Sequence, residues 1–108
     1  MDRRRRELLE LKAIVLQAIS HPLRLAILDV LRRGEQCVCD IARRVGAKRS
    51  NVSRHLSVMA NAGVLSYRKE GLMVYYRLCC PCILEALECV TRVLREQGDR
   101  RRTLLRKL

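Results

Sequence analysis

The hydrophobic pattern changes its period at Gly63, and this change limits the folds that the chain can adopt. Before Gly63, apolar residues recur at the three- and four-residue spacing of amphipathic helices. After it, residues 64–69 and 72–78 alternate like β-strands on either side of Glu70-Gly71. Two β-prone runs around a two-residue turn with glycine predict a hairpin, so we expect a mainly helical chain with one hairpin.

Four helices are expected before the hairpin and one after it, which gives the order ααααββα. Their approximate ranges are 7–19, 22–31, 38–45, 50–60 and 81–94. Proline suits the first turn of a helix and glycine its end, which accounts for Pro22 and Pro81 at two starts. Gly34 and Gly98 are expected to end the second and the last helix. Ser50 is a favourable N-cap for the fourth helix.

The third and fourth helices are short and joined by a tight turn at 46–49, the pattern of a helix-turn-helix. With the hairpin as its wing, the predicted fold is a winged helix-turn-helix. One domain over 7–97 is expected, flanked by basic tails over 1–6 and 98–108. The first and last helices carry broad apolar faces outside the helix-turn-helix. We therefore expect them to pair with a second copy in a two-fold homodimer.

The fourth helix is expected to read DNA. With Val52, Leu56 and Met59 turned inward, short or forked polar side chains face out and can reach base edges in a major groove. Basic residues just before this helix and in the hairpin are placed for the DNA backbone. The predicted DNA-binding residues are Lys48, Arg49, Ser50, Asn51, Ser53, Arg54, His55, Arg68 and Lys69. A two-fold dimer predicts a double-stranded operator that carries an inverted repeat.

Charge and composition agree with a nucleic-acid partner. The net charge is +12, and the chain stays basic when the two tails are set aside, which favours a polyanion. No run of 18 uninterrupted apolar residues and no signal-peptide pattern is present, so we expect a cytoplasmic protein without a membrane partner. No general-base carboxylate pair is apparent, so an enzyme is not expected.

Six cysteines carry the most specific chemical signal. In the cytoplasm they are expected to bind metal or react with oxidants rather than to form a disulfide framework. They form two clusters and one single position: Cys37 with Cys39, then Cys79, Cys80 and Cys82, then Cys89. Each cluster is expected at the start of a helix, where the helix dipole lowers the pKa of a thiol and favours the thiolate.

Thiolates select soft or borderline ions, so the expected inducer is As(III) or Sb(III), or else Cd(II), Pb(II) or Zn(II), with no organic cofactor. Cys37 and Cys39 are two residues apart, and such residues point about 200° apart in a regular helix. Joint ligation therefore requires the pair to straddle the helix end or the first turn to distort. Cys89 lies in the middle of the last helix, and we expect it to pack as a small hydrophobe.

Several segments carry a family resemblance: 18–28 (AISHPLRLAIL), 37–42 (CVCDIA), 50–56 (SNVSRHL), and 68–71 (RKEG) followed by 74–76 (VYY). In them the chain resembles the ArsR/SmtB family of metal-sensing repressors. The resemblance implies a homodimer that occupies its operator without metal and releases it when metal binds. The Cys-Val-Cys-Asp box resembles the inducer site of the arsenite and cadmium/lead branches, which implies Cys37 and Cys39 as ligands.

The chain departs from both branches. The arsenite branch often has a third cysteine where Ala42 stands, and the cadmium/lead branch uses N-terminal cysteines, whereas residues 1–36 contain none. The remaining ligand would come from the later cysteines or from a small molecule. Zinc-sensing members place ligands where Cys80 and Cys82 stand, and Cys79 completes a possible three-thiolate site. One composite site and two separate sites both stay open.

Two other functions compete with a metal-sensing repressor. A thiol-redox or persulfide sensor on the same fold would release DNA in metal-free buffer. A structural metal-binding or protein-interaction module would not bind DNA at all.

Overall fold

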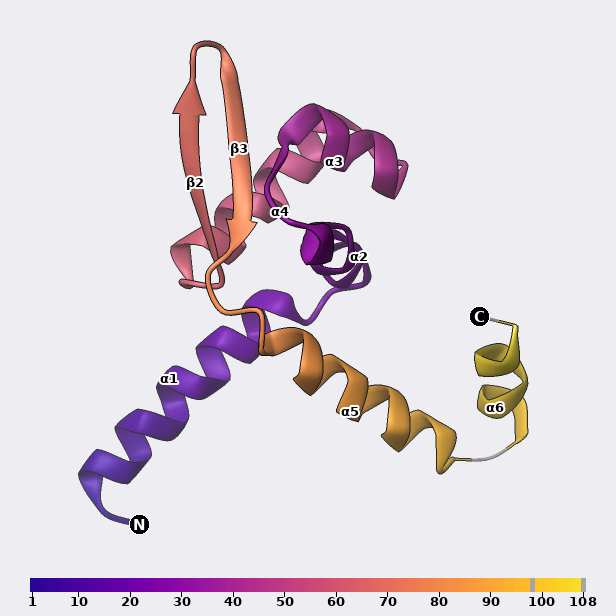
Figure 1. Cartoon of the computed structure of the whole chain (residues 1–108). Helices are drawn as coiled ribbons and strands as arrows, with labels where there is room; N and C mark the ends of the chain where they lie inside the picture. Colours follow the sequence, from indigo (N-terminus) through magenta and orange to yellow (C-terminus); the bar gives the residue numbers. More distant parts are fainter. Residues whose placement is uncertain (98, 108) are drawn as a thin grey trace.

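The computed structural model describes residues 1–97 and 99–107, whose elements follow one another as Figure 1 shows. They are α1 (Arg3–Ile19), α2 (Pro22–Val30), the 3₁₀ turn η1 (Leu31–Arg33), β1 (Gln36–Cys37), α3 (Val38–Val45), α4 (Arg49–Asn61), β2 (Leu65–Glu70), β3 (Met73–Leu78), α5 (Ile83–Arg95) and α6 (Asp99–Arg106). The predicted winged helix with order ααααββα is confirmed, and η1, β1 and α6 are additions to it. Gly98, the predicted end of the last predicted helix, lies outside the described residues.

Both predicted tails contribute helix. α1 begins at Arg3, because the Oδ1 atom of Asp2 accepts a hydrogen bond from the Arg5 amide at 2.8 Å and caps the helix. The segment 1–6 therefore supplies the first turn of α1, and α6 occupies most of the segment 98–108.

Two predicted helix starts are wrong. α4 begins at Arg49 with Lys48 as its N-cap, so Ser50 lies inside the first turn. The left-handed Gly46 (φ 69°) ends α3, and the chain enters α4 within three residues. α5 begins at Ile83 rather than at Pro81. The carbonyl of Pro81 instead accepts from the Leu84 amide at 3.0 Å, within a turn that leads into the helix.

The sheet contains the predicted hairpin of β2 and β3, with β1 added on the other side of β3. Glu70 pairs with Met73, so the turn is Gly71-Leu72 and the predicted turn at Glu70-Gly71 is one residue too early. Gly71 has φ 61°, a conformation that glycine adopts without strain, and this places it as the first turn residue. β1 spans two residues, which is too short to leave a periodic signal in the sequence.

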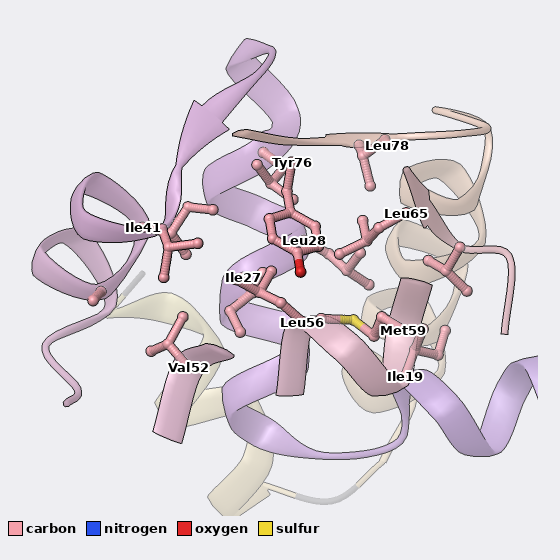
Figure 2. Packing of buried hydrophobic residues seen from close by; sticks show 14 of the residues in the cluster. Ile19, Ile27, Leu28, Ile41, Val52, Leu56, Met59, Leu65, Tyr76 and Leu78 are labelled. Atoms are coloured by element: carbon pink, nitrogen blue, oxygen red, sulfur yellow. The ribbon is translucent and has the colours of Figure 1, made fainter. Parts of the chain in front are cut away.

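The core lies between α2, α3, α4 and the sheet, as Figure 2 shows. Its fully enclosed side chains are aliphatic or thioether: Ile27, Leu28, Leu31, Ile41, Val52, Leu56 and Met59. Tyr76 of β3 packs over them from the sheet. Full burial stabilises each such side chain by about 1.5–3 kcal/mol. The inward positions predicted for α4, namely Val52, Leu56 and Met59, are confirmed, and this core fixes how α4 presents its other side.

α1 and α5 diverge from the core, as Figure 1 shows. Ala18 and Ile19 are the buried residues of α1, and Leu84 is the buried residue of α5. Large apolar side chains stay exposed on both helices: Leu8, Leu9, Leu11, Ile14, Leu16, Val90 and Val93. No single described helix is long and apolar enough to cross a membrane. Taken together, α1 and residues 22–33 have the length and composition of a span, but the two segments are bent by 84° relative to each other.

Candidate DNA-binding surface and cysteine clusters

α3 and α4 form the helix-turn-helix, and α4 turns a polar side to the surface. Most predicted DNA-binding residues of this region are exposed, namely Lys48, Arg49, Ser50, Ser53 and Arg54, and Asn51 is half-buried. The Nη2 atom of Arg54 donates to Oδ1 of Asn51 at 2.7 Å, which holds an amide and a guanidinium side by side. These groups have the donor and acceptor types that read base edges in a major groove.

His55 does not face solvent, so the prediction that its side chain faces outward is wrong. It is 8% exposed, and its Nδ1 atom accepts a hydrogen bond from Nε of Arg24 at 3.0 Å. Periodicity alone did not show this, because position 55 lies at the edge of the stripe made by Val52 and Leu56. Burial lowers the pKa of His55, and the charges of His21, Arg24 and Arg54 lower it further.

Arg24 of α2 contacts both α1 and α4, the helix predicted to read DNA and hereafter the recognition helix. Besides its bond to His55, its Nη1 atom donates to the Ala18 carbonyl near the end of α1 at 3.2 Å. The His21 ring lies 4.6 Å from that of His55, and its Nδ1 atom caps α2 by accepting from the Leu23 amide at 3.0 Å. Arg24 could not be predicted from the sequence, since no motif or spacing relates positions 24 and 55.

The wing places its two basic residues in different environments. Arg68 donates to both carboxylate oxygens of Glu35 at 2.7–3.1 Å and to Glu70 at 2.6 Å, and its guanidinium lies 4.6 Å from the centre of the Tyr75 ring. The hydrogen bond from Arg68 is the main cause that lowers the pKa of Glu35. Lys69 is exposed and has no ion pair or hydrogen-bond partner within the described part of the chain.

The first cysteine cluster is divided between the inside and the outside of the protein. Cys37 is the N-cap of α3 and Cys39 lies in its first turn, as predicted. Cys37 is also the second residue of β1, where it pairs with Tyr75 of β3. Cys37 is 6% exposed, whereas Cys39 is exposed. The two thiols therefore do not share an environment in this conformation.

The second cluster lies on the surface between β3 and α5. Cys79, Cys80 and Cys82 are all exposed, and the Sγ atoms of Cys80 and Cys82 are 2.8 Å apart. The hydrogen bond with Cys80 raises the pKa of Cys82, and the charge of Cys80, burial and Glu85 raise it further. The prediction that a helix start lowers the thiol pKa is wrong for Cys82, because a neighbouring sulfur opposes a second negative charge.

Neither cluster forms a complete metal site within one chain. Among residues 1–97 and 103–107, whose side chains the structure describes, no three His, Cys, Asp or Glu side chains are grouped closely enough to hold one ion. Each cluster thus offers at most two thiolates at once in this conformation. Cys89 is exposed on α5, so the expectation that it packs as a small hydrophobe does not hold within a single chain.

A helix-turn-helix with a β-hairpin wing and a basic, exposed recognition helix defines a winged-helix DNA-binding transcriptional regulator. Residues 21–67 match the family model described as bacterial regulatory protein, arsR family. The chain belongs to this ArsR family, and it is a DNA-binding regulator rather than an enzyme.

Relatives agree with this assignment. The chain is 43% identical over 67 residues to the cadmium resistance transcriptional regulatory protein CadC homolog of Staphylococcus aureus, a match that covers 61% of this chain and 55% of that protein. It is 31% identical to Mb0332 of Mycobacterium bovis, described as a homodimeric winged helix-turn-helix DNA-binding domain, with a TM-score of 0.76 and coverage of 92% and 95%. The structure of the AntR antimony-specific transcriptional repressor matches with 31% identity, a TM-score of 0.67 and coverage of 79% and 80%.

Proposed function

We propose that this chain is a homodimeric repressor that leaves its operator when a thiophilic ion binds its cysteine thiolates. As(III) or Sb(III) is the first choice of ion, and Cd(II) or Pb(II) the next. The similarity to an antimony-specific repressor and to a cadmium resistance regulator supports both choices. Thiolate donors favour all four of these ions over Mg or Ca.

The exposed apolar faces of α1 and α5 support the homodimer. Leu11 and Ile14 on α1 are 61% and 54% exposed, and Val93 on α5 is 57% exposed. Contiguous apolar surface of this kind marks an interface in a small protein. A Leu11→Glu, Ile14→Glu variant is expected to sediment as a monomer where the wild-type chain sediments as a dimer. A two-fold dimer would present two α4 helices to an inverted repeat.

The position of Cys37 carries the sensing part of the proposal. It is the N-cap of α3 and a paired residue of the wing sheet, so it belongs to both halves of the DNA-binding unit. Cys37 points inward and Cys39 outward, so a single ion can take both thiolates only if the first turn of α3 changes. α3 packs directly on α4, and a distorted α3 would therefore move the recognition helix.

The remaining ligand would come from Cys79, Cys80, Cys82, a partner copy or a small molecule. Cys80 and Cys82 already bring two sulfurs together, which also allows a separate site at the start of α5. A metal titration that follows the sulfur-to-metal absorption separates these arrangements. Wild type is compared with Cys37→Ser, Cys39→Ser and with Cys80→Ser, Cys82→Ser, and Cys89→Ser is the control.

A composite site predicts that both double variants lose the absorption, and two sites predict that each loses part of it. Absorption that is unchanged in both double variants contradicts the ligand assignment. In a gel-shift assay with DNA from the gene's own upstream region, no retarded band at low salt contradicts the repressor itself. Such a result would favour a structural or protein-interaction module.

The 2.8 Å separation of the Cys80 and Cys82 sulfurs favours a second candidate, a thiol-redox or persulfide-responsive repressor. Peroxide would take two electrons from the two thiols, which lose two protons and form a disulfide while the peroxide becomes water. Peroxide or polysulfide in metal-free buffer would then release the DNA. Cys80→Ser would abolish that response, and Cys37→Ser, Cys39→Ser would keep it.

A further inference from the structure

Arg68 lies in the same row of the sheet as Cys37. Cys37 of β1 pairs with Tyr75 of β3, and Tyr75 pairs in turn with Arg68 of β2. Glu35 lies two residues before Cys37, and its side chain reaches across the sheet to Arg68. Its carboxylate accepts from the Nε and Nη2 atoms of Arg68 at 3.0 and 2.7 Å. Arg68 is therefore connected to the Cys37 segment in two ways. One is the strand pairing through Tyr75 of β3, and the other is the direct ion pair with Glu35.

The guanidinium of Arg68 is already occupied by carboxylates. Nε and Nη2 bind Glu35, and Nη1 binds Glu70 at 2.6 Å, so each of its three nitrogens has an anionic partner. One face also lies over the Tyr75 ring at 4.6 Å. A DNA phosphate would have to displace a two-pronged carboxylate to reach Arg68. Lys69, the next residue, has no such partner among the described residues and is exposed.

We infer that Arg68 is a positioning residue that ties the wing to the Cys37 strand, and that it does not contact DNA phosphate. This inference rests on the proposed function in one respect, namely that Cys37 takes part in sensing. Arg68 then transmits a displacement of Cys37 to the wing, while Lys69 supplies the wing's contact with the DNA backbone.

The other attachments of β1 are its pairing with β3, its continuity with α3 and one side-chain hydrogen bond of Gln36. It contains two residues, and the Nε2 atom of Gln36 donates to the Val30 carbonyl at 2.6 Å. The Oε1 atom of the same side chain is buried and has no hydrogen-bond partner, so β1 is held incompletely on this side. The Glu35–Arg68 pair thus adds an attachment between the Cys37 segment and β2, beside the backbone pairing of β1 with β3.

Alkylation of single cysteines tests this link without any metal. Pulse labelling with iodoacetamide, resolved by mass spectrometry, is carried out on wild type, Arg68→Ala, Glu35→Gln and Lys69→Ala. Loss of the pair is expected to speed labelling of Cys37 roughly fivefold in the first two variants, as for an ion pair of ordinary strength. The Lys69→Ala variant and the exposed Cys39 serve as controls and should not change. Labelling of Cys37 that stays at the wild-type rate in both variants overturns the link.

The salt dependence of DNA binding tests the second half of the inference. The logarithm of the affinity falls with the logarithm of salt concentration, by about 0.9 for each phosphate neutralised. Fluorescence anisotropy on a duplex from the upstream region should show this slope reduced by about 1.8 in Lys69→Ala, because a dimer carries two Lys69 side chains, and unchanged in Arg68→Ala. A slope that falls in Arg68→Ala overturns the inference. If no ion releases the wild-type protein, the proposed function fails, but both measurements still decide the role of Arg68.

Discussion

The two cysteine clusters differ in what each one lacks. Cys37 and Cys39 are connected to the DNA-binding elements, because one of them is a residue of the wing sheet and the N-cap of α3, but their thiols lie on opposite sides of the surface. Cys80 and Cys82 have their sulfurs 2.8 Å apart, but they lie outside the helix-turn-helix and the wing, on an exposed turn between β3 and α5. The first cluster is therefore part of the DNA-binding elements, but its two thiols are separated. The second cluster has two sulfurs close together, but it lies outside those elements.

This difference suggests a way in which ion binding can be coupled to a change of conformation, namely through a site whose thiols are apart before the ion binds. A ligand shifts a conformational equilibrium only as far as it binds one state better than the other. A pair that is already assembled can bind an ion with little change elsewhere. In the proposed mechanism a divided pair has to draw its two thiols together, and that movement would take place where the α3–α4 unit and the wing meet.

The largest difference between the two clusters should appear in stability, because the core residues next to them are buried to different extents. Ile41 of α3 is fully buried beneath the first cluster, so Ile41→Ala is expected to lower the free energy of unfolding by about 2–5 kcal/mol. Leu84 at the start of α5 is the buried residue of that helix and packs at the edge of the core. Leu84→Ala should cost less, at the lower end of that range, in urea unfolding of the metal-free protein. Equal losses would contradict the distinction.

Release from DNA should separate the clusters next. Metal-induced release corresponds to a coupling free energy of about 1–3 kcal/mol, or a 5–150-fold loss of operator affinity. Cys37→Ser, Cys39→Ser should bind metal-free DNA as wild type does and show almost no loss when As(III) is added. Cys80→Ser, Cys82→Ser should keep most of the loss, as measured by fluorescence anisotropy, with Cys89→Ser as the matched control. The reverse outcome would assign sensing to the second cluster.

The smallest effect on stability should come from pH. It acts through the buried His55 of α4, the helix on which the α3 of the first cluster packs. Burial lowers the pKa of His55 below its usual 6.5, so the unfolded chain takes up a proton before the folded one does. The stability is fully present above about pH 6.5 and is lost as the pH falls from there toward the folded-state pKa. Thermal unfolding between pH 7.5 and 5 should show this decline in wild type. The decline should be weaker in His55→Gln, and equal slopes would contradict the role of His55.

Much of the architecture could be predicted from the sequence because periodicity records which face of each element is buried. The positions Val52, Leu56 and Met59 follow the helical spacing, and the structure encloses all three. The winged helix and the hairpin follow from similar local signals. The start of α4 was predicted wrongly, because Lys48 takes the cap without any side-chain hydrogen bond that a sequence motif would reveal.

The cysteine spacing by itself determined that two thiol clusters lie near helix starts and that Cys37 and Cys39 oppose each other. Only the tertiary structure decided that Cys37 belongs to the wing sheet, that Arg68 is held by Glu35, and that Arg24 holds His55 inside. These pairs are 31 to 33 residues apart or join separate elements. No local pattern encodes such contacts, since they depend on how the elements pack rather than on the spacing within any one of them.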